Sequence, residues 1–176
     1  MKFKTSFGFT LIEILVYIGV FSVVFAALIS FIIWVNKSNI KTQAMREVSD
    51  NLKLAMDKMI YEIRTAKSIY TPTVTSSQLS LETLNYLPEG ETFSYIDFFL
   101  CGPLSDTLCL KKESQNPVAL TSPRVKIDNL TFTLIGTSTS TSSVQIELKV
   151  SYKNPQNLTE YQASVAATST ASLRSY

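Results

Sequence analysis

The sequence predicts an α+β protein in which a long N-terminal helix packs on a C-terminal antiparallel β-sheet. Residues 9–35 are almost uniformly apolar, residues 36–67 place apolar side chains at helical spacing, and residues 68–176 alternate with the period of a strand. These patterns divide the chain into a short polar leader at 1–8, a membrane-spanning helix at 9–35, its amphipathic continuation at 36–67 and a β-rich globular domain at 68–176.

The apolar segment at residues 9–35 is long enough to cross a membrane. As a helix rising about 1.5 Å per residue it measures roughly 40 Å, and the hydrocarbon core of a bilayer is about 30 Å thick. Glu13 is the only charged side chain in the segment. A carboxylate deep in a bilayer costs about 2.5–3.5 kcal/mol on insertion scales, so we expect Glu13 to have a partner.

The segment at residues 36–67 is predicted to continue the helix with one apolar face. No Pro or Gly interrupts residues 20–70, and Thr71-Pro72 favours an end at about Lys67. The intervening positions, including Glu62, are polar, so the apolar face is the one that packs on the domain. This face consists of Ala44, Val48, Leu52, Ala55, Met56, Met59, Ile63 and Ala66.

The remaining sequence reads as a series of antiparallel strands. The alternation is clearest in "SVQIELKVSY" at 143–152, and it slips at Asp128-Asn129 inside "RVKIDNLTFTLI", which indicates a bulge or a short break. Further strands are expected in "SQLSLET", "TFSYIDFFL" and "EYQASVAAT", and residues 136–143 read as a flexible hairpin loop. One apolar face per strand suits an antiparallel sheet packed on the helix.

The two cysteines, Cys101 and Cys109, flank a turn in "FFLCGPLSDTLCLKK". The segment reads as a hairpin whose strands could bring the thiols opposite each other. In an oxidising compartment a local disulfide is favoured, and the alternative is a pair of buried free thiols. Two cysteines without a nearby His do not suit a metal site.

Composition argues against several classes of function. The net charge of +2 is not gathered into a basic cluster, so no nucleic-acid partner is predicted. The chain has no His, and it has neither a nucleophile motif nor a Gly-rich phosphate loop, so we expect no enzyme activity and no cofactor. Asp97, Asp106 and Asp128 form no recognisable loop, and no bound metal is predicted.

The N-terminus carries a more specific pattern: the basic leader "MKFKTSFG" ending at Gly8, then Phe9, "TLIE" and the long apolar run. This arrangement resembles the type IV prepilin signal. The resemblance implies that prepilin peptidase cuts between Gly8 and Phe9 on the cytoplasmic side and N-methylates Phe9. It also implies that Glu13 has the assembly role of this family, with other subunits, the inner-membrane assembly platform and membrane lipid as partners.

The physical chemistry of the proposed cut gives Glu13 two candidate partners. Cleavage creates an α-amine with an ordinary pKa of about 7.7–8.0 at the edge of the apolar run. Glu13 lies one helical turn beyond that amine, so it can pair with the amine of its own chain or with that of a neighbouring subunit. The family role favours the neighbour.

The layout of the whole chain also resembles the pilin family. The stretch "LKLAMDKMIYEIRTAKSI" and the ending "TASLRSY" are similar to minor pilins and to J- and W-type minor pseudopilins. This implies a structural subunit of a type IV pilus, competence or type II secretion filament, held in the cytoplasmic membrane by one span with its C-terminal domain outside the cytoplasm. The alternative is a membrane-anchored adhesin or binding protein that would use the loops at 85–92 and 102–107.

Overall fold

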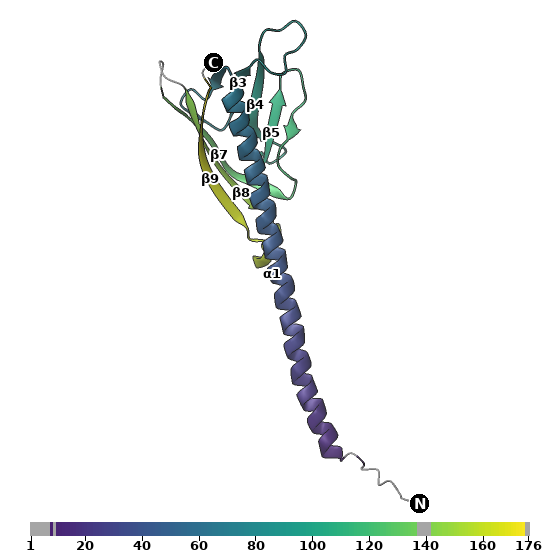
Figure 1. Ribbon diagram of the computed structural model, residues 1–176. Coiled ribbons are helices and arrows are strands. Elements are labelled where there is room, and N and C mark those ends of the chain that lie inside the picture. The colour runs from purple at the N-terminus through teal and green to yellow at the C-terminus, as the bar shows by residue number, and fades with distance from the viewer. Residues whose placement is uncertain (1–7, 9, 137–141, 175–176) are drawn as a thin grey trace, which may run out of the picture. The chain divides into compact units, whose positions relative to one another are not determined.

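A computed structural model describes residue 8 and residues 10–136 and 142–174 (Figure 1). The chain forms two compact units, Met1–Ile40 and Lys41–Tyr176, which are described separately below. The helix α1 runs from Leu11 to Thr65, so it begins in the first unit and ends in the second. Its end lies two residues before the predicted one.

The helix of the first unit has an apolar surface that nothing in the unit covers. Large apolar side chains are exposed on all sides of this helix: Leu11, at its start, is 83% exposed, and Trp34, further along, is 66% exposed. Among the described residues, α1 is the one helix long and apolar enough to cross a membrane by length and composition, and no residue in its apolar window is buried. A helix that is apolar all round needs lipid or other helices around it.

The second unit contains two antiparallel sheets rather than the single sheet that the sequence predicts. The first has the order β1-β3-β4-β5-β6, and the second has the order β2-β7-β8-β9. The strands of the first sheet are β1 Ser68–Thr71, β3 Leu79–Thr83, β4 Ser94–Cys101, β5 Thr107–Lys112 and β6 Val118–Ala119. Those of the second are β2 Thr75–Ser76, β7 Val125–Ile135, β8 Ser143–Tyr152 and β9 Ser164–Ser172, with a short 3₁₀ helix, η1, at Thr159–Tyr161 before β9.

The β7–β8 hairpin agrees closely with the sequence pattern. β8 has the predicted bounds, and the register of β7 shifts between Ile127 and Asn129, which confirms the predicted irregularity at Asp128-Asn129. The predicted hairpin loop at 136–143 falls mostly on residues 137–141, which lie outside the described residues.

One hydrophobic core joins the helix to both sheets. All eight residues of the predicted apolar helix face are buried, and they pack in one cluster with the inward side chains of β3, β4, β5, β7 and β8. Phe98 and Phe132, one from each sheet, are among the largest side chains that are fully buried. The predicted arrangement of an amphipathic helix packed on antiparallel strands is therefore confirmed, with one correction: Glu62, read as a polar surface position, is buried at 1% exposure.

Candidate functional site

The first turn of α1 is fixed by Thr10, immediately before the helix. The Thr10 carbonyl accepts hydrogen bonds from the backbone N–H groups of Glu13 at 3.1 Å and Ile14 at 3.3 Å, and its Oγ1 accepts one from Glu13 N at 3.3 Å. This is the hydrogen-bonding pattern of an N-cap residue. The Thr10-Leu11-Ile12-Glu13 segment also has the spacing of a capping box, so local sequence alone sets the position of Glu13 in the first turn.

The Glu13 carboxylate has a partner that the sequence reasoning missed. The hydroxyl of Tyr17 donates a hydrogen bond of 3.3 Å to Glu13 Oε1 from one turn further along the helix. No described cation pairs with Glu13, and Phe9 lies outside the described residues. The i,i+4 spacing of Glu13 and Tyr17 was the signal that could have revealed the contact.

The predicted cleavage position is open to solvent. Gly8 is exposed, and no described atom lies within 4 Å of the place that a Cβ would occupy there. Packing against the described residues therefore does not require glycine at position 8. A requirement for glycine would have to come from a protein that acts on this segment.

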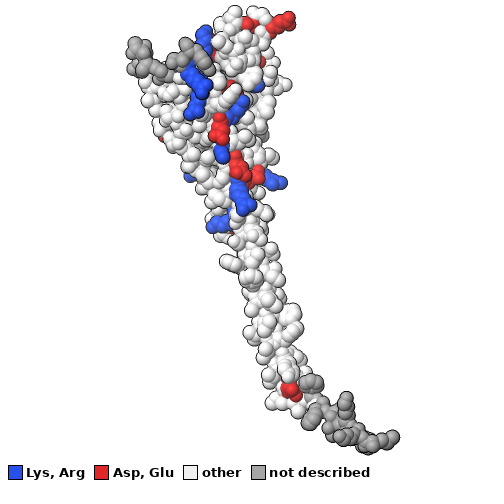
Figure 2. Space-filling view, viewed as in Figure 1, with Lys and Arg blue, Asp and Glu red and all other residues white. Residues whose placement is uncertain are grey.

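The polar side chains inside the apolar segment are satisfied by their own helix. Ser22 Oγ donates to the carbonyl of Ile18 at 2.7 Å, and Ser30 Oγ donates to that of Ala26 at 2.9 Å. Figure 2 shows a long uncharged surface along this segment, because residues 14–36 contain no Lys, Arg, Asp or Glu. A helix surrounded by hydrocarbon must satisfy its polar groups internally in this way.

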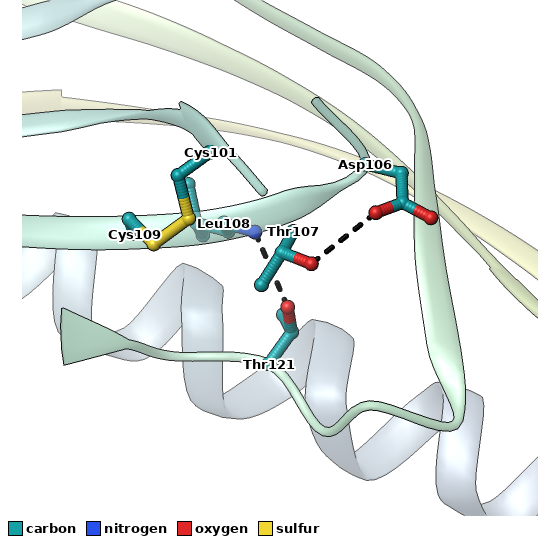
Figure 3. The surroundings of a disulfide bond; sticks show 6 residues. All are labelled: Cys101, Asp106, Thr107, Leu108, Cys109 and Thr121. Atoms are coloured by element: carbon teal, nitrogen blue, oxygen red, sulfur yellow. Dashed lines mark hydrogen bonds between the residues drawn. A yellow bond between two sulfur atoms is a disulfide. The ribbon is translucent and has the colours of Figure 1, made fainter. Parts of the chain in front are cut away.

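The two cysteines form a disulfide across the β4–β5 hairpin (Figure 3). They are not directly opposite: Cys101 pairs with Thr107, and Cys109 pairs with Phe99. Their Cα atoms are 5.9 Å apart, inside the usual range of about 4.4–6.8 Å.

The turn between the cysteines is anchored to the second sheet. Asp106 accepts a hydrogen bond from Thr107 Oγ1 at 3.3 Å (Figure 3) and pairs with Lys153 at 3.1 Å, and the Lys153 ammonium holds the pKa of the Asp106 carboxyl below its usual 3.8. The backbone N–H of Leu108 donates to Thr121 Oγ1 at 3.2 Å. The β4–β5 hairpin is thus bonded to Lys153 through its turn and to Thr121 through β5.

We expect this disulfide to form in the protein and to stabilise it. Because the cysteines are eight positions apart in the sequence, replacing both by Ser is expected to cost about 2–3 kcal/mol of unfolding free energy. Alkylating the folded and then the denatured protein without reductant, followed by intact mass measurement, tests the bond. Two alkylated thiols would contradict it, and the reduced sample provides the positive control.

Asp97 and Asp128 each contact a polar or charged side chain. Asp97 accepts a hydrogen bond from Ser80 Oγ at 2.5 Å, and Asp128 pairs with Lys126 at 3.2 Å. No group of three or more His, Cys, Asp or Glu side chains with metal-binding geometry occurs among the described residues.

One comparison with known proteins matches the chain. The family model of the prokaryotic N-terminal methylation motif matches residues 4–29, a segment that contains Gly8, Phe9 and Glu13 together with the Thr10 cap and Tyr17. No curated protein and no solved structure matches.

Proposed function

We propose that this chain, which its N-terminal methylation motif and α+β fold mark as type IV pilin-like, is the precursor of a structural subunit in an extracytoplasmic filament. The filament is a type IV pilus, a competence pilus or a type II secretion pseudopilus, and the chain is a minor pilin or minor pseudopilin. The observation that carries the proposal is the motif match over residues 4–29, which includes the start of a helix whose apolar surface is exposed on all sides.

The exposed apolar helix explains how such a subunit is stored and then assembled. In the cytoplasmic membrane, lipid covers the side chains from Leu11 to Trp34, while the second unit lies outside the cytoplasm. In a filament the same surface packs against the helices of other subunits. Lipid and neighbouring helices can both cover the apolar side chains of the helix, so the membrane serves as the pool from which the assembly platform takes subunits.

Glu13 supplies a preference for the filament. While the subunit is in lipid, the Tyr17 hydroxyl is a neutral partner for the carboxylate, at 3.3 Å. After cleavage, the N-methylated α-amine of Phe9 on a neighbouring subunit offers a charged partner. The amine adds the attraction of an opposite charge, which the Tyr17 hydroxyl lacks and which is stronger in a low-dielectric filament core than in water, so the carboxylate gains by exchanging Tyr17 for the neighbour's amine.

Processing tests the proposal directly. We expect the mature chain to begin at Phe9 and to carry one added methyl group, as measured by mass spectrometry of the membrane fraction. Gly8→Val should block cleavage without affecting insertion, because the substituted position contacts no described atom and the apolar run is unchanged. The matched control is Gly19→Val, which also faces open space but lies away from the scissile bond and should be processed normally.

The result that would contradict this proposal is a mature chain that begins at Met1 or after Ala27. Cleavage of Gly8→Val at the wild-type rate would also contradict it, because Gly8 would then have no role in recognition.

A further inference from the structure

The strand β9 ends the second sheet with one side unpaired. Its hydrogen-bonded neighbour is β8 alone. Two backbone bonds fix which groups point toward β8: Tyr152 N–H donates to the carbonyl of Ala163 at 2.9 Å, and Leu173 N–H donates to that of Ser142 at 3.1 Å. Ala163 and Leu173 therefore sit in hydrogen-bonded pairs, and such pairs alternate along an antiparallel ladder.

This alternation identifies the groups on the free side. The odd-numbered residues of β9 direct their N–H and C=O groups toward β8, and the even-numbered residues direct theirs away from it. No described residue forms a hydrogen bond with the outward backbone groups, and the side chains beside them are small, uncharged and exposed. The outward residues are Ser164, Ala166, Thr168, Thr170 and Ser172.

The other sheet edges in the described chain are short or interrupted. β1 has four residues and is followed by Pro72, while β2 and β6 have two residues each, β6 directly after Pro117. Short strands and prolines are the usual means by which proteins prevent edge-to-edge pairing. β9 has nine residues, with neither proline nor charge, so it is the longest edge strand of the two described sheets and has none of these protective features.

We propose that the free edge of β9 is a strand-addition surface that binds an extended, uncharged segment of another polypeptide. The five outward residues offer both donors and acceptors for a new antiparallel ladder, as in other cases of β-augmentation. Their Ser, Ala and Thr side chains leave room for a partner strand, and they offer no counter-charge for a charged side chain that pairing would bury, which favours an uncharged partner. An incoming strand with small or β-branched residues matches them, since Thr pairs across strands are favourable.

A second copy of β9 is not the partner in this antiparallel ladder, because β9 runs in the same direction as the helix of its unit. The end of the sheet where β9 begins is held to the helix by Ser122 N–H donating to Asn51 Oδ1 at 2.7 Å. Just beyond the end of β9, Arg174 N–H donates to the carbonyl of Arg64 at 3.4 Å. Antiparallel pairing of two β9 strands would therefore set two helices in opposite directions. Subunits of one filament, which the proposed function orients alike, cannot adopt that arrangement.

Amide hydrogen exchange of the full chain in detergent micelles tests this proposal residue by residue. The probe is a synthetic peptide with the sequence of residues 164–172. Without the peptide, the outward N–H groups of β9 should exchange rapidly and the inward ones slowly. With the peptide in excess, we expect the outward groups to exchange at least tenfold more slowly, while the inward groups change little.

Thr168→Pro removes one outward N–H and leaves the β8 ladder complete, so peptide-induced protection should be lost at Ala166 and Thr170. The matched control Thr168→Val keeps the N–H group and should respond like wild type. Slow exchange of the inward groups shows that the variant is folded, and Ala166→Pro repeats the test if Thr168→Pro fails that check.

Three results would overturn the proposal: no added protection in wild type, equal responses of Thr168→Pro and Thr168→Val, or protection that rises with protein concentration in the absence of peptide. The last result would identify a second copy as the occupant. None of them affects the processing test at Gly8, so this inference and the proposed function can fail independently.

Discussion

Glu13→Ala should leave the protein in the membrane and prevent its incorporation into filaments. Insertion should improve, because a carboxylate that costs about 2.5–3.5 kcal/mol in the hydrocarbon has been removed. Cleavage after Gly8 should continue, since the scissile bond is unchanged. Incorporation should fall by more than about a hundredfold, which corresponds to the roughly 3 kcal/mol lost when one partner of a buried charge pair is removed.

Two further variants separate charge from local hydrogen bonding. Glu13→Gln keeps the size of the side chain and removes its charge, so it should fail to assemble like Glu13→Ala if the neighbour's amine is the partner. Tyr17→Phe is the matched control: it removes the hydroxyl at 3.3 Å and leaves the carboxylate, so it should assemble close to the wild-type level. Crosslinking in cells and recovery of sheared filaments measure incorporation.

If Glu13→Ala and Glu13→Gln both assemble like the wild type, the Glu13 carboxylate has no role in the assembly of this subunit. The alternative of an anchored adhesin or binding protein would then be favoured. Failure of Tyr17→Phe together with normal assembly of Glu13→Gln would mean that the hydrogen bond within one chain, and not the contact between chains, is the important one.

The second large effect concerns the ion pair inside the globular unit. Lys58 Nζ lies 2.6 Å from Oε1 of Glu62, whose side chain is 1% exposed. Apart from this ion pair, neither carboxylate oxygen of Glu62 has a partner among the described residues. Removing the cation would leave a buried carboxylate without compensation, which is among the costliest defects that a folded protein can carry.

Lys58→Met is expected to lower the free energy of unfolding by about 3 kcal/mol, the low end of the range for breaking a buried pair, because the Lys58 side chain is 32% exposed. Adding Glu62→Leu should restore most of the loss, since a buried pair can be replaced by apolar side chains at little cost. The control Lys53→Met removes an exposed lysine of the same helix and should change stability by less than about 0.5 kcal/mol. Urea unfolding in micelles, followed by near-ultraviolet circular dichroism, measures all three.

The same pair predicts a dependence on alkaline pH. The contact with Glu62 raises the pKa of Lys58 above its usual 10.5. The stabilisation should therefore be complete below pH 10.5 and disappear as the pH rises through the higher pKa of the folded state. Lys58→Met should lack this alkaline loss. An equal destabilisation of Lys53→Met and Lys58→Met would contradict the role given to the buried pair.

The features that the sequence predicted correctly are those set by local periodicity. The buried face of α1 and the bounds of β8 follow from regular spacing of apolar residues, and the irregularity in β7 follows from a slip in that spacing. The short strands β1, β2 and β6 carry no such pattern, because a strand of two to four residues is defined by the neighbour with which it pairs. The division into two sheets was missed for the same reason.

Two residues show why the candidate site was predicted only in part. Glu62 is polar in an otherwise regular helical pattern, and periodicity cannot distinguish a polar side chain on the surface from one buried beside a lysine. Tyr17 lies among apolar residues and was counted as one of them, although its hydroxyl is one turn from Glu13. In both cases the chemistry depends on contacts between side chains, which the apolar pattern does not record.

The position of the Thr10 cap has a consequence for the timing of assembly. Every hydrogen bond of that cap is made by residues that follow the proposed cut between Gly8 and Phe9. Release of the leader would therefore break none of the hydrogen bonds that the structure describes in the first helical turn. If the chain is processed and assembled as proposed, the first turn that carries Glu13 is already formed when the new amine appears, and we expect filament growth to be limited by subunit encounter and extraction from the membrane.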